Sequence, residues 1–114
     1  ARCEPAYAEL EALLEPRGCG VLYLAAVDPD LGYAQARSFY CDVGGAVSED
    51  PATGSAAGPL CAYLHERLGL ERILIDQGVM MSRPSRLEAQ MDLDRVRVSG
   101  DVVILAVGEI RLPV

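Results

Sequence analysis

The stretch "SEDPATGSAAGPLCAYL" (48–64) leads from a polar segment into a run of small and apolar residues. Helical spacing continues to about residue 69, and one face of this helix is apolar, formed by Ala57, Leu60, Cys61, Leu64 and Leu68. Additional alanines widen that face, so we expect the first half of the helix to be buried on most sides. Such a helix, over about residues 55–69, predicts a sheet that wraps around it.

Segments of helix and strand character flank this central helix. An N-terminal helix is predicted at 5–18, where leucines have helical spacing until Pro16. Apolar or alternating runs predict strands at 20–28, 33–40, 72–78, 85–94, 95–100 and 101–114. Residues 41–54 are rich in Gly and Asp and predict a loop. The order of elements predicts one α+β domain over 1–114, with a strongly curved, mostly antiparallel sheet or barrel around the central helix.

The composition excludes several classes of function. The chain has 114 residues, 51% of them hydrophobic, with a net charge of −7 and a pI near 4.5. An acidic chain argues against nucleic acid and anionic membrane surfaces, because both select basic patches. The longest apolar run, "VVILAV" (102–107), has the length of a strand and not of a membrane helix. A small anion at a helix N-terminus remains compatible with this charge.

The cysteines and the histidine bear on compartment and metal binding. The four cysteines are widely spaced, as is typical of thiols in a reducing compartment, and they are Cys3, Cys19, Cys41 and Cys61. The single histidine, His65, is accompanied by no C-x-x-C pair, so we expect no metal site. The N-terminal residues lack the pattern of a signal peptide. We therefore expect a cytoplasmic location.

The junction before the central helix allows two interpretations. In the first, Thr53 or Ser55 is a helix N-cap, and the acid that precedes it suits the helix dipole. In the second, small residues leave the first helical N–H groups uncovered, so that a ligand carboxylate binds them and Asp50 transfers a proton. The residues alone leave both interpretations open.

The same junction resembles a known family. The segment "EDPATGSAAGPLCAYL" (49–64) closely resembles the signature of the phenazine-biosynthesis isomerase-like family, which has the diaminopimelate-epimerase fold. Three more segments are similar to that family, namely "ARSFY" (36–40), "DQGVMMSRPSRLEAQ" (76–90) and "VRVSGDVVILAVGEIRL" (96–112). The resemblance covers nearly the whole chain, although Ser82 stands where glycine is common.

The resemblance implies a fold and a chemistry. Members of the family have two pseudo-symmetric halves, each a β-barrel around a central helix, with the active site between them. They need no cofactor and catalyse proton shifts on small carboxylic acids. By position, Asp50 and Ser55 would be catalytic, and Thr53, Gly54 and Ala56 would bind the substrate. The chain resembles only the C-terminal half, so the general-base glutamate of the other half has no counterpart here.

Two main functional hypotheses follow. The first is a cofactor-independent isomerase that shifts a double bond in, or epimerises, a small carboxylic acid. Its cleft would be completed by a second copy, as a homodimer, or by a separate N-terminal half-domain. In a homodimer, two Asp50 side chains would face one cleft, one acting as acid and one as base. The second hypothesis is a non-catalytic module for small-carboxylate binding or assembly that lost the catalytic half. A purely structural domain, whose motif is only a cap, is the third alternative.

Overall fold

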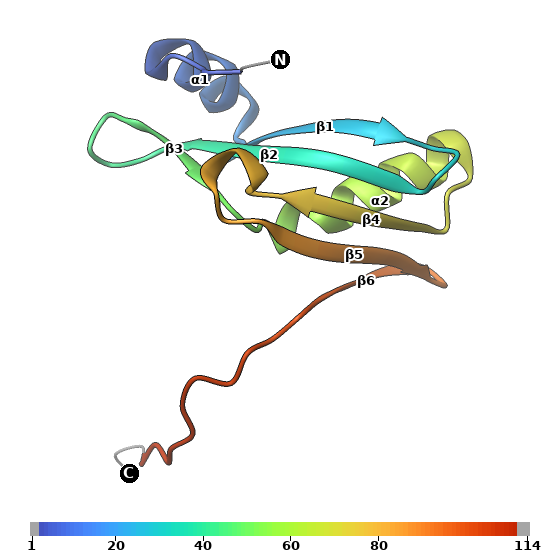
Figure 1. Ribbon diagram of the computed structural model, residues 1–114. Helices are drawn as coiled ribbons and strands as arrows, with labels where there is room; N and C mark the ends of the chain where they lie inside the picture. Colours follow the sequence, from blue (N-terminus) through green and yellow to red (C-terminus); the bar gives the residue numbers. More distant parts are fainter. Residues whose placement is uncertain (1–2, 112–114) are drawn as a thin grey trace.

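The computed structural model describes residues 3–111, and its elements are shown in Figure 1. In chain order they are α1 (Tyr7–Leu14), η1 (Glu15–Arg17), β1 (Leu22–Asp28), β2 (Tyr33–Cys41), β3 (Val47–Asp50), α2 (Gly54–Leu68), β4 (Arg72–Gln77), η2 (Val79–Met81), β5 (Ser85–Asp92) and β6 (Arg95–Gly100), where η marks a 3-10 helix. The predicted N-terminal helix, central helix and strands before residue 101 are confirmed. Helix α1 ends just before Pro16, which lies in η1.

The sheet brings the ends of two distant strands together. Its strand order is β1-β2-β4-β5-β6, and β3 also pairs with β2. All strand pairs are antiparallel except β2 with β4, as expected for a mostly antiparallel sheet. Ser38 of β2 is the partner of Asp50, and the nearby Ala36 is the partner of Gln77. The end of β3 and the end of β4 therefore meet beside the middle of β2.

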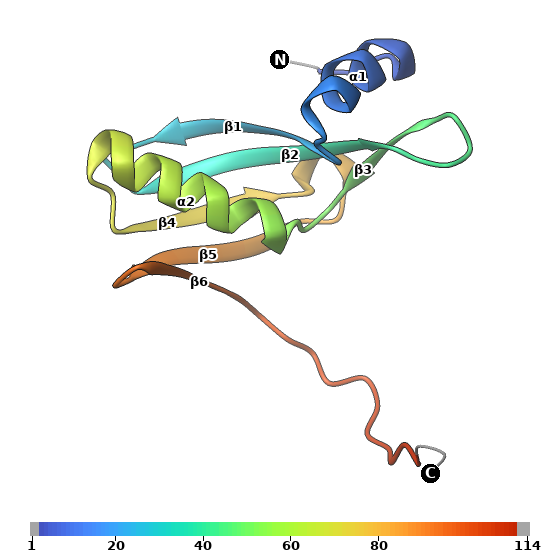
Figure 2. The same cartoon turned by 180° about the vertical axis from the view of Figure 1, so that it is seen from behind.

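The sheet is open, which corrects the expectation of a strongly curved barrel. Helix α2 lies on one face, against β4, β5 and β6 (Figure 2). On the side of α2 that faces away from the sheet, Tyr63 and Leu68 are 56% and 57% exposed. Strands β1 and β6 remain the two ends of the sheet, because residues 101–111, which were expected to continue it, belong to no strand. The helix is thus covered on one side and not wrapped.

Residues 41–54 were expected to be a loop, and this expectation is wrong for their central part. Strand β3 pairs with the end of β2 and makes a hairpin. The Asp42 carboxylate closes the turn, because it accepts hydrogen bonds from the Gly44 N–H at 2.8 Å and the Ser48 hydroxyl at 2.9 Å. A side chain thus organises a strand whose sequence has little apolar alternation.

Two apolar clusters lie on opposite faces of the sheet. The larger fills the space under α2, and its buried residues are Ala34, Ala36, Ala57, Cys61, Leu64, Ile73, Ile75, Leu87 and Ala89. The smaller joins α1 to the other face through Leu10, Leu14 and Phe39. Side chains alternate between the faces of a strand, so Ser38 shares the α2 side with the larger cluster while Phe39 faces α1.

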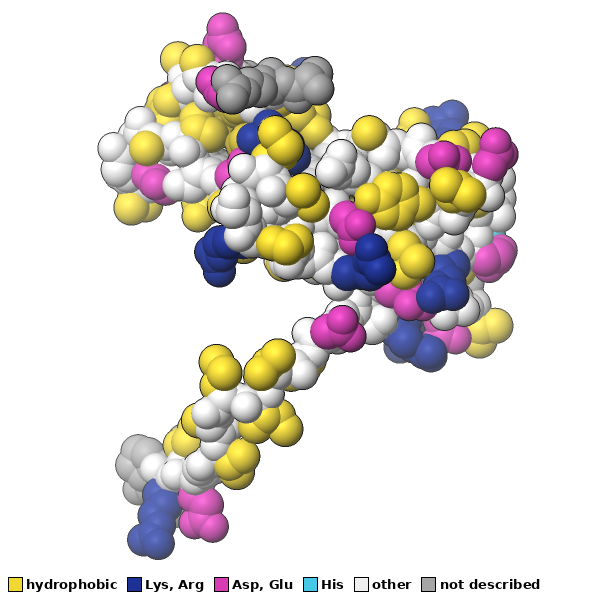
Figure 3. All heavy atoms as spheres, viewed as in Figure 1, with side chains coloured by type: hydrophobic (Ala, Val, Ile, Leu, Met, Phe, Trp, Pro, Cys, Tyr) yellow, Lys and Arg dark blue, Asp and Glu magenta, His cyan; other side chains and the backbone are white. Residues whose placement is uncertain are grey.

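Residues 101–111 leave the sheet after β6 and extend away from the body of the protein (Figures 1 and 2). The prediction of a strand here is wrong for residues 101–111, and residues 112–114 lie outside the described residues. Six large apolar side chains of this segment are between 78% and 93% exposed, namely Val102, Val103, Ile104, Leu105, Val107 and Ile110. Figure 3 shows the segment as a row of apolar groups away from the rest of the surface. We call residues 102–110 the apolar tail.

Candidate functional site

The junction between β3 and α2 is held by side chains and not by a helix cap. Thr53 occupies the N-cap position, but its hydroxyl donates to Asp50 Oδ2 at 2.7 Å and caps no helical N–H. The Ala52 N–H approaches Asp50 Oδ1 at 3.4 Å. Ser55 lies inside the first turn of α2. The interpretation of Thr53 or Ser55 as a side-chain N-cap is therefore wrong.

The first turn of α2 presents unpaired backbone donors as a result. The N–H groups of Ala56 and Ala57 both bond to the Thr53 carbonyl at 3.1 Å. The N–H groups of Gly54 and Ser55 donate to no other group among residues 3–111. The helix dipole adds partial positive charge at this end, and no acidic residue occupies the first turn. A small anion bound here would accept two backbone hydrogen bonds.

A hollow of about 550 Å³ opens beside this end of α2. It lies between the junction, the start of β5 and the end of β6, and it is lined by Ala52, Gly54, Pro84, Ser85, Arg86, Leu87, Val98, Ser99, Gly100 and Asp101. Its size is within the range of pockets for small ligands. A second hollow, of about 400 Å³, is lined in part by Leu24, Gln35 and Met80 and contains no residue of the motif. The first hollow is therefore the candidate site.

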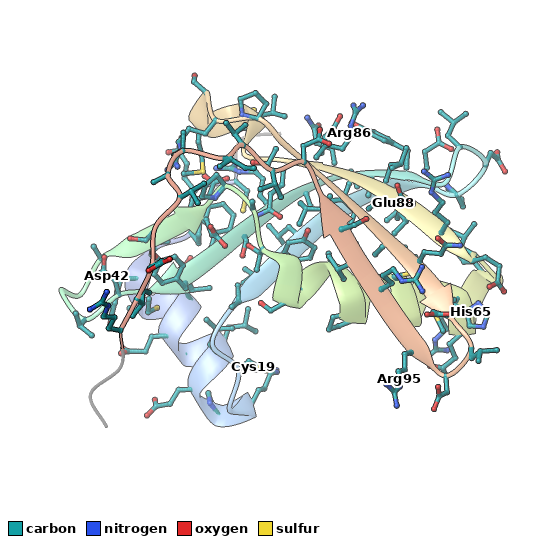
Figure 4. All side chains as sticks on the ribbon, turned by 90° about the horizontal axis from the view of Figure 1, so that it is seen from below. Cys19, Asp42, His65, Arg86, Glu88 and Arg95 are labelled. Carbon is teal, nitrogen blue, oxygen red and sulfur yellow. The ribbon has the colours of Figure 1, made fainter. Side chains whose placement is uncertain are left out.

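The cation beside the hollow is already paired within the protein. Arg86 donates to both carboxylate oxygens of Asp76, at 2.8 and 3.0 Å. This pairing holds the pKa of Asp76 below its ordinary value. Figure 4 shows Arg86 at one end of the β5–β6 hairpin, and His65 and Arg95 toward the other end. Because His65 lies there, with Nδ1 3.3 Å from Glu71 Oε1, it does not contribute to the candidate site.

The predicted site residues meet at the junction but differ in exposure. Ser55 is exposed in the first turn of α2, whereas Asp50, Gly54 and Ala56 are partly buried. Thr53 is only 6% exposed, and its hydroxyl is engaged with Asp50. Of these five residues, Gly54 lines the hollow. The catalytic roles of Asp50 and Ser55 stay predictions.

Gln77 lies in the segment 76–90 that resembles the family, but the sequence analysis gave it no role in the site. It is fully buried at the end of β4. Its Nε2 donates to the Asp50 carbonyl at 2.7 Å and to Thr53 Oγ1 at 2.9 Å. Its Oε1 accepts from the Thr53 N–H at 3.2 Å and from the Tyr23 hydroxyl at 3.0 Å. The signal in the sequence was its place in the strand. Side chains alternate between the faces of a strand, so Gln77 lies on the same buried face of β4 as Ile73 and Ile75.

The charged groups around the motif are divided between the two faces of the sheet. Burial and, as the lesser cause, the nearby Asp50 carboxylate together raise the pKa of Tyr23 to about 12. The phenol is therefore protonated at neutral pH, as its hydrogen bond to Gln77 requires. The neighbouring acid Glu49 accepts two hydrogen bonds from Arg37, at 2.9 and 2.8 Å. Glu49 thus belongs to a separate ion pair.

Metal, membrane and disulfide features are absent from the part of the chain that the structure describes. Across residues 3–111, no three His, Cys, Asp or Glu side chains are grouped so that they could hold a metal ion. No helix in the same range has the length and apolar character that a membrane crossing requires. The cysteines there are free thiols.

Related proteins are known by sequence. The family described as phenazine biosynthesis-like protein (PhzC-PhzF) matches residues 4–108. A trans-2,3-dihydro-3-hydroxyanthranilate isomerase of Pseudomonas chlororaphis is 47% identical over 74 residues, which cover 58% of this chain and 27% of that protein. An uncharacterized isomerase of Clostridium acetobutylicum is 30% identical over 125 residues, which cover 97% of this chain and 40% of that protein.

A related fold is known as well. The solved structure of a predicted epimerase from Pseudomonas aeruginosa matches with a TM-score of 0.50 and 32% identity, over 94% of this chain and 38% of that one. The chain spans 27% and 40% of the length of the two curated relatives described above. The resemblance drawn from the motif is confirmed, and the chain corresponds to only part of these proteins.

Proposed function

We propose that this chain, which belongs to the phenazine biosynthesis-like protein family, forms part of a cofactor-independent isomerase that acts on a small carboxylic acid. The observation that carries the proposal is the junction of β3 and α2. There the Asp50 carboxylate is hydrogen-bonded to Thr53, the residue directly before the unpaired N–H groups of Gly54 and Ser55, and Gly54 lines the hollow. The names of the related proteins, isomerase and epimerase, support this class of reaction.

The proposed roles follow from the chemistry of each group. The unpaired N–H groups of Gly54 and Ser55 at the start of α2 bind the substrate carboxylate, because a helix N-terminus favours an anion. The Ser55 hydroxyl adds a further donor beside them. The Asp50 carboxylate exchanges a proton with a carbon of the bound acid. Moving a proton between two carbons needs a base and an acid, and the motif of this chain supplies one such group.

We propose that the second group comes from outside this chain, from a second copy or from an N-terminal half-domain. The chain spans 25% to 40% of its curated relatives. The outer side of α2 and the apolar tail both expose large apolar side chains. Contiguous exposed apolar surface of this kind is typical of contact with another protein. A second copy would bring two Asp50 carboxylates to one cleft, one as acid and one as base.

A non-catalytic module that binds small carboxylates is the second candidate. The observation that favours it is the engagement of Asp50, whose two oxygens accept from the Thr53 hydroxyl and the Ala52 N–H. A carboxylate held in this way supports the junction. In this case a small acid would bind at the start of α2 without proton exchange.

Solvent exchange distinguishes the two candidates. The chain is incubated in deuterium oxide with trans-2,3-dihydro-3-hydroxyanthranilate, the compound in the name of the Pseudomonas chlororaphis relative, and carbon-bound deuterium is measured by mass spectrometry. We expect incorporation that is lost in Asp50→Asn. Asp30→Asn, in an exposed turn, is the matched control. Incorporation that survives Asp50→Asn would exclude the proposed role of that carboxylate. A higher melting temperature with 3-hydroxyanthranilate but no incorporation would favour the binding module.

Light scattering on the purified chain tests how the cleft is completed. A dimer that incorporates deuterium supports completion by a second copy. A monomer that becomes active only when a separately produced N-terminal half-domain is added supports completion by that half. A monomer that is active alone contradicts the proposal that the second group comes from outside the chain.

A further inference from the structure

The buried amide of Gln77 uses its full hydrogen-bonding capacity on the junction and on β1. A glutamine side chain has two donor hydrogens and two acceptor lone pairs. Gln77 donates to the Asp50 carbonyl and Thr53 Oγ1, and accepts from the Thr53 N–H and the Tyr23 hydroxyl, over 2.7 to 3.2 Å. A fully buried polar side chain would destabilise the fold if these partners were missing. Three of the four bonds fix residues of the motif.

The backbone partners determine which end of the amide is the nitrogen. The Asp50 carbonyl can only accept, so the atom 2.7 Å from it is the donor Nε2. The Thr53 N–H can only donate, so the atom 3.2 Å from it is the acceptor Oε1. Neither contact would survive a flip of the amide, which removes the usual ambiguity between these two atoms.

This orientation also fixes the proton of Thr53. The hydroxyl oxygen accepts from Gln77 Nε2, so its single hydrogen is free to point elsewhere. The acceptor within reach is Asp50 Oδ2, at 2.7 Å. A directed series of bonds therefore runs from Gln77 through Thr53 to the Asp50 carboxylate. Gln77 also holds the backbone of Asp50, so the same side chain fixes both ends of that residue.

Gly78 adds a second contact between β4 and the junction. Its φ is +74°, in the left-handed region that glycine adopts without strain. A Cβ at this position would lie 2.9 Å from the Pro51 carbonyl oxygen and would also meet the Arg83 carbonyl oxygen. The absent side chain therefore lets the backbone after β4 pack directly on Pro51. The pair Gln77–Gly78 therefore contacts Asp50, Pro51 and Thr53.

We infer that Gln77 is a positioning residue for the Asp50 carboxylate, acting through the Thr53 hydroxyl and seated by the close packing of Gly78 on Pro51. The inference rests on the proposed function, because it concerns the carboxylate that would exchange the proton. It gives Thr53 a role other than the substrate binding that the resemblance implied. The Thr53 side chain aligns Asp50 and is not a direct contact of the substrate.

The first test uses a spectroscopic signature that does not need turnover. In the 114-residue chain, the Thr53 amide and hydroxyl protons and the Asp50 carboxyl carbon are followed by NMR. Gln77→Met, which keeps the length but removes the amide, is expected to speed exchange of the Thr53 amide at least about tenfold relative to the amides of Ile73 and Ile75. It is also expected to shift the Asp50 carboxyl carbon. Gln90→Met, at an exposed site on β5, is the matched control.

Substitutions of Thr53 keep the test decisive if Gln77→Met fails to fold. Thr53→Val removes the hydroxyl and retains the shape, so it is expected to shift the Asp50 carboxyl carbon in the same direction as Gln77→Met. Thr53→Ser restores the hydroxyl and should reduce that shift. If Thr53→Val leaves the Asp50 resonance where it is in the parent chain, the series of bonds is absent in solution and the inference is overturned.

A kinetic test links the arrangement to the reaction. Where the parent protein, with its completing half or copy, incorporates deuterium, Thr53→Val is expected to lower kcat by about 10- to 100-fold, because small displacements of a reacting group are costly. The KM for the same acid should change by less than about threefold, since the N–H groups of α2 still bind the carboxylate. A rise in KM with kcat unchanged would overturn the positioning role. If the parent protein incorporates no deuterium, the proposed function fails, and the NMR results alone decide this inference.

Discussion

The junction around Asp50 and the apolar tail differ in whether their side chains find partners within the described part of the chain. At the junction, the polar groups of Gln77 and Thr53 are buried and bonded within the chain. In the tail, apolar side chains with the composition of a strand have no partner among the described residues. The difference indicates which features are self-contained. Hydrogen bonds within this chain hold Asp50 in position, whereas nothing among residues 3–111 covers the apolar side chains of the tail.

The largest effect should come from paired substitutions that compare the core with the tail. Ile75, fully buried under α2, and Ile104, 78% exposed in the tail, are the same residue in opposite settings. We expect Ile75→Ala to lower the free energy of unfolding by about 3 kcal/mol, through lost burial and a cavity. Ile104→Ala should change it by less than about 0.5 kcal/mol. Urea denaturation of the dilute chain measures both.

Protein concentration sharpens this comparison. If a second copy covers the tail, Ile104→Ala should become destabilising as the concentration rises, while the cost of Ile75→Ala should stay the same. An Ile104→Ala cost equal to that of Ile75→Ala in the dilute monomer would contradict the exposed position of the tail.

The next effect is a loss of stability at alkaline pH, caused by Tyr23. Its pKa is about 12 in the folded protein against 10.0 ordinarily, because of burial and the Asp50 carboxylate. The stabilisation is complete below pH 10 and is lost as the pH rises to 12, because the unfolded chain loses the proton first. A shift of this size corresponds to about 2.7 kcal/mol, and solvent screening of the partly exposed phenol lowers the expected loss to about 2 kcal/mol. Tyr23→Phe should flatten this part of the stability profile, measured by denaturation at successive pH values.

Tyr40→Phe is the control for the alkaline experiment, because Tyr40 is 37% exposed at the far end of β2. It should leave the alkaline loss in place. If Tyr23→Phe loses stability between pH 10 and 12 as steeply as the parent chain, the buried phenol is not the cause.

A smaller effect is expected at the start of α2, where the chain lacks an acidic residue. Ser55→Asp would place a carboxylate beside the unpaired N–H groups and should raise stability by about 0.5 to 1 kcal/mol. The same charge should exclude a bound acid, so that 3-hydroxyanthranilate no longer raises the melting temperature. Glu66→Asp, on the exposed side of the last turns of α2, serves as the control. Retained binding in Ser55→Asp would show that the acid binds elsewhere.

The same contrast explains what could be predicted from the sequence. The central helix was predictable because its apolar residues recur at helical spacing along the sequence. Strand β3 was missed because the Asp42 carboxylate, and not an apolar pattern, closes its hairpin. The closing strand was wrongly expected over the apolar tail, because strand composition does not supply a pairing partner. Without that pairing the sheet stays open and α2 is covered on one side.

The roles of the residues at the junction stay predictions, and their arrangement could not be predicted from the sequence. The resemblance named Asp50, Thr53 and Ser55, and the structure brings them to one junction. The resemblance could not show which group the Thr53 hydroxyl bonds to, because a threonine suits both a helix cap and a hydrogen bond to Asp50. The role of Gln77 was not predicted, because its hydrogen bonds join segments that meet only through the pairing of β3 and β4 with β2. Long-range contacts of this kind leave little local signal in the sequence.

The smallest expected effect compares two turns with positive φ, one next to the junction and one far from it. Ser82, with φ of +57°, ends the turn after Gly78, and Leu93, with φ of +59°, lies between β5 and β6. Replacing either residue by glycine relieves strain in the folded backbone but raises the conformational entropy of the unfolded chain. The free energy of unfolding should therefore rise by about 0.5 kcal/mol in each variant. Thermal denaturation measures the gain. If Gln77 and Gly78 hold the junction without help from the turn at Ser82, the Thr53 amide should exchange at the same slow rate in Ser82→Gly and in Leu93→Gly. Faster exchange in Ser82→Gly alone would mean that the strained turn itself supports the position of Asp50.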